Sequence, residues 1–234
     1  MADNFKERFS QAVKETETVV YSYLPEETGH QKTIFEAMNY SVKAGGKRLR
    51  PLLMREVYRL FGGNGPEIEP FMAAMEMIHT SSLIHDDLPC MDNDEYRRGK
   101  LTTWKAYGYD MAVLAGDALM IYAFETASKA FSMGADPAKV GRAIGILAEK
   151  TGIYGMIGGQ TVDVELTGKA VPREKLDFIY RLKTGALLEA SMMIGAVLAG
   201  ATVEEIKEVE TMASEVGLAF QIQDDILDVT STQE

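Results

Sequence analysis

Apolar residues recur at helical spacing along almost the whole chain. The pattern predicts helices over residues 4–24, 31–43, 51–61, 70–85, 109–131, 137–152, 173–198 and 202–229. Prolines and glycine pairs stand at their ends, as helix boundaries require. No run of alternating apolar and polar residues indicates a strand. We therefore expect an all-α helical bundle and, because no linker composition interrupts it, a single domain over residues 1–234.

Composition narrows the class of protein. The 234 residues are 46% hydrophobic and 25% charged, which is ordinary for a globular protein and excludes disorder. Lys and Arg number 24 against 35 Asp and Glu, so the net charge is −11. This acid excess, without any Lys/Arg run, argues against a nucleic-acid partner and against a polybasic membrane anchor.

The single cysteine, Cys90, cannot form an intramolecular disulfide, so we expect a reducing, cytoplasmic location. The N-terminus is polar and charged, unlike a signal peptide. The most apolar stretch, residues 190–201, is shorter than the ~18–20 residues needed to span a bilayer. We expect a buried core helix there and no membrane span.

Two segments, 84–94 and 220–228, concentrate aspartates at the ends of apolar helices. Asp224 and Asp228 lie one turn apart, where like charges repel unless a cation lies between them. Pro89 breaks the first helix, which would allow Asp92 to turn back toward Asp86. Either segment alone is equally compatible with a solvated acidic face, but the apolar flanks argue against one. Carboxylates without His or Cys partners favour Mg²⁺ shared with substrate phosphates.

Cationic residues that could hold phosphate occur in three places: Lys47 and Arg50 after a glycine pair, Arg97 and Arg98 after the first aspartate segment, and Lys183. Each group alone is as readily explained by exposed, solubilising charge. A lone histidine on an apolar helix, such as His79, is more often a core residue than a ligand.

Six ordered motifs resemble the short-chain trans-isoprenyl diphosphate synthases, which include the farnesyl and geranylgeranyl diphosphate synthases. They are GGKRLRP at 45–51, HTSSLIHDDLPCMDNDEYRRGK at 79–100, LAGDAL at 114–119, GGQTVD at 158–163, KTGALLEAS at 183–191 and FQIQDDILD at 220–228. The aspartate segments match the two aspartate-rich motifs of this family, the first in its longer form.

The resemblance implies an all-α orthogonal helical bundle around a deep central cavity, usually a homodimer, that condenses isopentenyl diphosphate with an allylic diphosphate (dimethylallyl, geranyl or farnesyl). Three Mg²⁺ per site are expected. The implied residues are as follows: for metal, Asp86, Asp87, Asp92, Asp224, Asp225 and Asp228; for the allylic substrate, Arg97, Lys183, Thr184 and Gln221; for isopentenyl diphosphate, Lys47, Arg50, His79 and Arg98. Of these, Asp86, Asp87, Asp92, Lys183, Thr184, Gln221 and Asp224 form the expected catalytic set.

The resemblance also bears on product length. Ser81 and Ser82 stand where C15-producing relatives often carry a bulky residue at the cavity floor. Small side chains there favour geranylgeranyl diphosphate, with farnesyl diphosphate as the alternative. A non-catalytic or truncated regulatory subunit and, less favoured, a class I terpene cyclase are the alternatives of other classes. Relatives continue well past the second motif, so we expect that C-terminal helices are missing.

Overall fold

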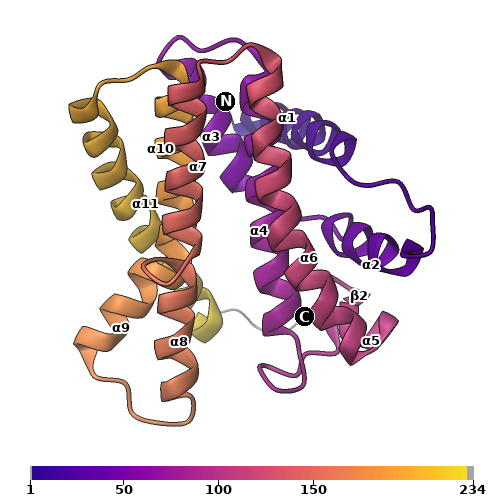
Figure 1. Cartoon of the computed structure of the whole chain (residues 1–234). Coiled ribbons are helices and arrows are strands. Elements are labelled where there is room, and N and C mark those ends of the chain that lie inside the picture. The colour runs from indigo at the N-terminus through magenta and orange to yellow at the C-terminus, as the bar shows by residue number, and fades with distance from the viewer. Residues whose placement is uncertain (1, 231–234) are drawn as a thin grey trace. The chain divides into compact units, whose positions relative to one another are not determined.

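The computed structural model describes residues 2–230, except the side chains of residues 2, 3, 224, 225, 228 and 229 (Figure 1). The described chain is helical apart from one two-stranded hairpin, so the all-α prediction is confirmed. The helices cluster into two compact units. Unit 1 comprises Met1–Arg55 and Gly65–Val140, and unit 2 comprises Glu56–Asn64 and Gly141–Glu234.

Unit 1 carries the N-terminal half of the fold. Its elements are α1 (Ala2–Ser22), α2 (Lys32–Val42), the first part of α3 (Leu49–Leu60), η1 (Pro66–Ile68), α4 (Glu69–Asp86), the hairpin β1 (Tyr96–Arg97) and β2 (Lys100–Leu101), α5 (Thr103–Tyr107), α6 (Tyr109–Ser128), η2 (Lys129–Met133) and the start of α7 (Pro137–Thr151). The antiparallel strands pair Tyr96 with Leu101.

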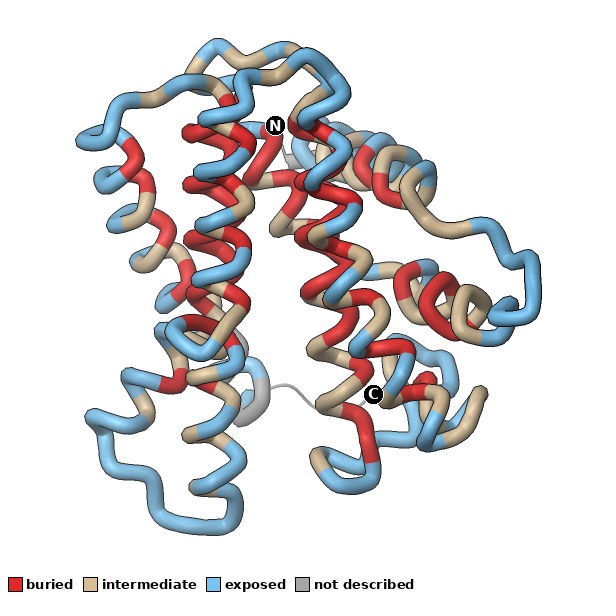
Figure 2. Tube along the Cα trace, in the orientation of Figure 1, coloured by how far each residue is buried: buried red, intermediate tan, exposed pale blue. Residues whose placement is uncertain are grey.

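Helix α4 forms the centre of unit 1. It is buried almost all round, as Figure 2 shows, and its methionines Met72, Met75 and Met77 fill the core. A helix that is apolar on every side is a core helix. Helix α6 packs closely along it, because a β-carbon at Gly116 would lie 2.1 Å from His85 Nε2. Glycine at this position therefore brings the two helices together.

Unit 2 carries the rest of α3 and α7, together with α8 (Met156–Leu166), α9 (Arg173–Ile179), the π-helical turn η3 (Tyr180–Gly185), α10 (Ala186–Ala199) and α11 (Val203–Thr230). Helix α10 is its core, with Ala186 to Leu198 all buried (Figure 2). The predicted buried helix at 190–201 is thus confirmed for residues 190–198, and the helix ends at Ala199. Lys150 on α7 forms ion pairs with Glu189 on α10 and, at 2.6 Å, with Glu210 on α11. This polar bridge joins three helices.

Each predicted helix is present, with ends within a few residues of those expected, but 173–198 contains the π turn. The pattern missed α8, whose consecutive glycines weaken a helical signal, and the short elements between 96 and 107. Two helical stretches, 109–133 and 173–199, are long and apolar enough to cross a bilayer. The most apolar part of the second stretch is 78% buried inside the protein. Core helices of globular proteins pass the same test.

Candidate functional site

The first aspartate motif is a tight turn at the end of α4. The helix ends at Asp86, and Pro89, which follows, cannot continue it. The backbone N–H of Asp92 then donates a hydrogen bond to the carbonyl of Asp86 at 2.9 Å. The predicted return of Asp92 toward Asp86 is therefore confirmed for the backbone. Asp86 is half-buried and Asp92 is exposed.

Asp87, which lies between Asp86 and Asp92 in the sequence, pairs with Arg97. Its side chain is buried and accepts three hydrogen bonds from Arg97: from Nε at 2.8 Å and 3.0 Å, and from Nη2 at 2.5 Å. Burial raises the pKa of Asp87, and Arg97 partly opposes this rise. The hydrogen bonds to Asp87 raise the pKa of Arg97. The roles predicted for these residues at the metal and the allylic diphosphate stay predictions.

The hairpin that carries Arg97 is shaped by its two-residue turn. Arg98 and Gly99 both have positive φ, 53° and 74°, as a type I′ hairpin turn requires. The turn directs Arg98 toward the glycine-rich loop, where its Nη1 donates to the carbonyl of Gly45. A β-carbon at Gly46 would lie 2.7 Å from the same Nη1, so glycine allows the two segments to meet. Asp87, Arg97 and Arg98 also line a cavity of about 30 Å³.

Three of the residues predicted to bind isopentenyl diphosphate form a cationic cluster in unit 1, namely Arg50, His79 and Arg98. Arg50 Nη1 lies 3.4 Å from His79 Nε2, and Arg50 Nε is buried without a hydrogen-bond partner among the described residues. Burial, and then the positive charges of Arg50 and Arg98, lower the pKa of His79 well below its usual value. Burial lowers the pKa of Arg50 too, although Glu76 opposes it. Arg50 is half-buried and Arg98 is exposed. Neighbouring cations that repel one another provide a favourable site for an anion. Lys47, the fourth predicted residue, is exposed.

One face of α4 connects this cluster to the aspartate motif. His79, Ser82 and Asp86 follow one another at helical spacing and are all half-buried. His79 and Asp86 are seven residues apart, which corresponds to roughly 10 Å along a helix. Ser82 lies between them on this face, and its hydroxyl donates to the carbonyl of His79 at 2.9 Å. Ser81, by contrast, is fully buried and donates to the carbonyl of Ile78.

In unit 2 the predicted polar residues lie on the π turn and on α11. Lys183 Nζ lies 2.6 Å from Asp163 Oδ2, and Thr184 Oγ1 donates to Gln221 Oε1 at 2.8 Å. A π turn inserted in a helix is frequent at functional sites. Close packing holds the turn, because a β-carbon at Gly159 would lie 2.4 Å from the backbone nitrogen of Lys183. Gly217 of α11 packs similarly against Gly185, which gives the glycine in KTG a structural reason.

The predicted metal ligands of the second motif, Asp224, Asp225 and Asp228, have side chains outside those that the structure describes. Among the side chains described, no three of the types that bind metals come together as a metal site. Asp86 and Asp92 nevertheless suit Mg²⁺, which typically takes one or two carboxylates and completes its shell with water and substrate phosphates. The number of ions stays a prediction.

Three polar residues that hold the site together were not among those predicted: Arg48, Glu76 and Asp163. Arg48 lies in the GGKRLRP motif beside the predicted ligand Lys47, and Asp163 ends the GGQTVD motif. Glu76 is an acidic residue within the otherwise apolar run of α4, and such a residue requires a buried partner. An acidic residue within an apolar helix was therefore the sequence signal that could have identified Glu76.

Comparison with known proteins gives the same family. The polyprenyl synthetase family model matches residues 31–234. The chain is 50% identical to a chloroplastic geranylgeranyl pyrophosphate synthase of Capsicum annuum over 86% of its length, and 47% identical to a geranylgeranyl diphosphate synthase of Cyanophora paradoxa over 88%. It covers 54% and 69% of these proteins, so it spans about half the length of the first relatives it matches.

A solved structure of an FPP/GFPP synthase from Zymomonas mobilis matches all of the chain, and 84% of that protein, with a TM-score of 0.91 and 37% identity. The predicted isoprenoid synthase fold is therefore confirmed. The family model covers well over half of the chain. The chain belongs to the polyprenyl synthetase family.

Proposed function

We propose that this protein is a Mg²⁺-dependent trans-prenyltransferase that condenses isopentenyl diphosphate with an allylic diphosphate. The observation that carries the proposal is the shared face of α4, which has the Arg50–His79–Arg98 cluster at one position and Asp86 two turns further on. One helix thus presents an anion site without carboxylate ligands beside a carboxylate site. Two diphosphates, one bound by cations and one by metal, would be held in a fixed relation.

In the proposed reaction the chain's own residues bind and orient the substrates. Arg50, Arg98 and Lys47 hold the diphosphate of isopentenyl diphosphate, and neutral His79 donates a hydrogen bond to it. Mg²⁺ held by Asp86 and Asp92 would supply Lewis-acid stabilisation of the allylic diphosphate as it departs. The isopentenyl double bond then attacks the allylic carbon, and a proton leaves to the released diphosphate. No protein nucleophile is needed.

We propose geranylgeranyl diphosphate as the product, with farnesyl diphosphate as the alternative. Two observations support C20: the small side chain of Ser82 on the accessible face of α4, and the similarity to proteins named geranylgeranyl pyrophosphate synthases, which are about 50% identical. Of the two residues predicted at the floor, Ser82 is the one with accessible surface. Replacing Ser82 with Phe should shorten the product.

The test is incubation with labelled isopentenyl diphosphate, Mg²⁺ and each allylic primer, followed by sizing of the products. We expect C20 from wild type, C15 from Ser82→Phe and no turnover from Asp86→Ala. Termination of the wild type at C15 would exclude the C20 assignment. Cyclised hydrocarbon would indicate a terpene cyclase, and turnover only in the presence of a partner synthase would indicate a regulatory subunit.

We further propose that the protein functions as a homodimer. Leu114 and Ile121, seven residues apart on α6, are 55% and 70% exposed, and a second copy would remove this apolar surface from water. One relative is named as a subunit of a heterodimeric synthase. Light scattering should give twice the chain mass for wild type and for Leu60→Glu, another exposed leucine, and the monomer mass for Ile121→Glu. A cytoplasmic location remains a prediction.

A further inference from the structure

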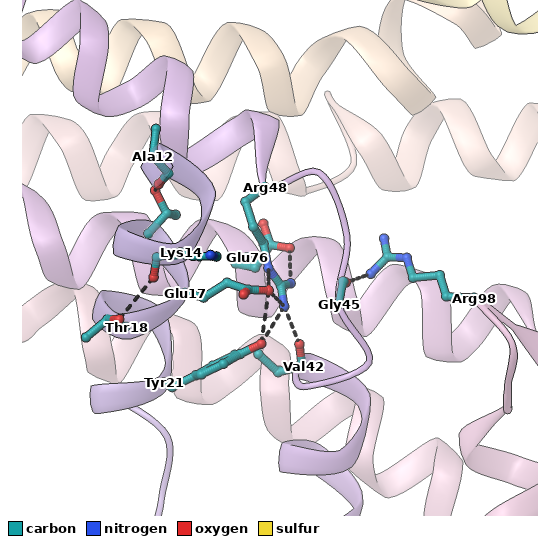
Figure 3. Close-up of polar contacts among 11 residues, drawn as sticks. Ala12, Lys14, Glu17, Thr18, Tyr21, Val42, Gly45, Arg48, Glu76 and Arg98 are labelled. Carbon is teal, nitrogen blue, oxygen red and sulfur yellow. Dashed lines mark hydrogen bonds and ion pairs between the residues drawn. The ribbon is translucent and has the colours of Figure 1, made fainter. Parts of the chain in front are cut away.

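The loop before α3 contains an arginine that the proposed reaction does not use. Lys47 and Arg50 are assigned to the diphosphate, but the side chain of Arg48, which lies between them, points into unit 1 (Figure 3) and is 0% exposed. Its Nη1 lies 2.6 Å from Glu76 Oε1, and its Nη2 donates to the carbonyl of Val42 at 2.8 Å. Burial alone would lower the pKa of Arg48, but Glu76 reverses this effect and raises it.

Helix α1 supplies the remaining partners of this guanidinium. Arg48 Nε donates to Glu17 Oε1 at 3.2 Å, and Nη2 donates to the hydroxyl of Tyr21 at 3.1 Å (Figure 3). The guanidinium also lies over the ring of Tyr21. Residues of α1, α2 and α4 therefore converge on one side chain of the loop. Because the guanidinium is planar and its donors are hydrogen-bonded to these partners, the Arg48 side chain is held in one orientation.

The backbone of the loop needs this anchor. Gly45, Gly46 and Arg48 all have positive φ, at 92°, 137° and 50°. Glycine adopts such angles readily, but a residue with a β-carbon does so only where surrounding contacts hold it. For Arg48 those contacts are the bonds of its guanidinium to Glu76, Glu17 and Tyr21.

This conformation sets the direction of the neighbouring residues. The carbonyl of Arg48 accepts a hydrogen bond from Leu52 at 3.1 Å and so begins α3. Lys47 is directed toward solvent before this point, and Arg50 enters the cluster with His79 after it. If the guanidinium lost its partners, the φ of Arg48 would relax, and Lys47 and Arg50 would change direction relative to each other.

We propose that Arg48 is a positioning residue for isopentenyl diphosphate, and that Glu17 and Tyr21 of α1 act through it, although none of the three touches the substrate. The inference rests on the proposed function, because the ligand is the one assigned to Arg50 and His79. It makes α1, which carries no predicted ligand, a determinant of diphosphate affinity.

The test uses variants on α1, away from the ligand, because a change at Arg48 would leave Glu76 buried and unpaired. Glu17→Gln removes the negative charge that pairs with the guanidinium, and Tyr21→Phe removes the hydroxyl that accepts a hydrogen bond from it. We expect each to weaken binding of isopentenyl diphosphate, measured by calorimetry in the presence of a chelator, and the double variant to weaken it about five- to tenfold. In turnover assays the KM for isopentenyl diphosphate should rise, with the KM for the allylic primer unchanged.

Two control variants on α1 separate positioning from loss of stability. Thr18→Ala removes an exposed hydroxyl whose hydrogen bond among the described residues is to the carbonyl of Lys14, and should have no effect (Figure 3). Val20→Ala removes buried apolar contacts beside Tyr21 and should lower the unfolding free energy, but it should leave the affinity within twofold of wild type. Equal losses of affinity in Val20→Ala and Tyr21→Phe would overturn the proposal.

Binding measurements on wild type, an Arg50 variant and the α1 double variant test the proposed function and the positioning role of Arg48 separately. If wild type does not bind isopentenyl diphosphate, or binds it independently of Arg50, the proposed function is wrong. If binding depends on Arg50 but the double variant Glu17→Gln, Tyr21→Phe retains wild-type affinity, only the positioning role is wrong. Weakening of both substrates together would likewise contradict it.

Discussion

The cationic cluster of unit 1 differs in its electrostatics from the polar cluster of unit 2, which consists of Asp163, Lys183, Thr184 and Gln221. In unit 1, Arg50 and His79 are desolvated, lie beside another cation, and have pKa values lowered by burial. In unit 2, Lys183 has a carboxylate 2.6 Å away, and Thr184 is bonded to Gln221. Among the described residues, no carboxylate forms an ion pair with Arg50 or Arg98, whereas Asp163 forms one with Lys183.

This difference indicates how each cluster would meet a ligand. An anion entering unit 1 would relieve repulsion that exists already, so binding requires little rearrangement. A ligand that used Lys183 would first have to displace Asp163. The buried ion pairs of the two units differ as well. Arg48 in unit 1 is wholly enclosed, while Lys150 in unit 2 keeps 15% of its side chain exposed.

The largest effect should come from those buried ion pairs. Glu76→Gln leaves the enclosed guanidinium of Arg48 without its closest carboxylate, which we expect to lower the unfolding free energy by about 3–5 kcal/mol. Glu189→Gln is the matched change in unit 2. Lys150 would retain Glu210 and some access to water, so the expected loss is about 1–3 kcal/mol.

Urea denaturation of the two variants measures both losses. A greater loss for Glu189→Gln than for Glu76→Gln would reverse the comparison, because it would place the more demanding buried charge in unit 2.

The next effect concerns the anion site itself. Arg50→Met removes a desolvated cation, so we expect the affinity for inorganic pyrophosphate in chelator to fall about 100-fold while the unfolding free energy is unchanged or rises. Lys183→Met, the matched change in unit 2, should leave this metal-free affinity unchanged. Calorimetry and urea denaturation measure the two quantities. Similar losses of affinity in both variants would show that the clusters do not differ in their readiness for an anion.

The same contrast explains what the sequence could predict. Long apolar segments located α4, α6 and α10, because burial there depends on side-chain type alone. Pro89 correctly implied the turn that brings Asp92 back to Asp86, since proline acts through local backbone geometry. The cationic cluster was predicted through the family resemblance, because only that likeness related Arg50 to His79.

What could not be predicted depends on packing between elements distant in the sequence. Helix α8 contains consecutive glycines, and its Gly159 is explained only by the approach of the π turn. Arg48 looked like one more member of a basic motif, yet its partners come from α1, α2 and α4. The pairing of Asp87 with Arg97 likewise depends on the hairpin, whose two-residue strands are too short to give a periodic signal.

His79 offers a pH-dependent test of the cluster in unit 1. Its folded pKa is lowered by burial and by Arg50 and Arg98, so the unfolded state binds more protons below the unfolded value of about 6.5. Stability should therefore fall as pH decreases below about 6.5, by at most about 1.4 kcal/mol per pH unit from this residue.

The measurement is urea denaturation of wild type and His79→Gln at pH 7.5, 6.5 and 5.5. The variant should lose less stability on acidification, whereas His30→Gln, at an exposed position, should follow wild type. If the unfolding free energies of wild type and His79→Gln fell equally on acidification, protonation of His79 would not be opposed by the cluster.

The smallest effect should come from the ion pair between Lys183 and Asp163. Both side chains are partly exposed, at 31% and 40%, and such pairs contribute about 0.2–1 kcal/mol. Asp163→Asn should therefore lower the unfolding free energy by less than about 1 kcal/mol, as should Glu36→Gln, which breaks the exposed pair with Lys32 in unit 1. Because the pair is weak, Lys183 could leave it for a diphosphate at little cost. If Asp163→Asn alone lowered the unfolding free energy by several kcal/mol, the ion pair would instead be needed to stabilise the π turn. Lys183 could then not leave Asp163 at little cost, and the proposed difference between the two clusters would be wrong.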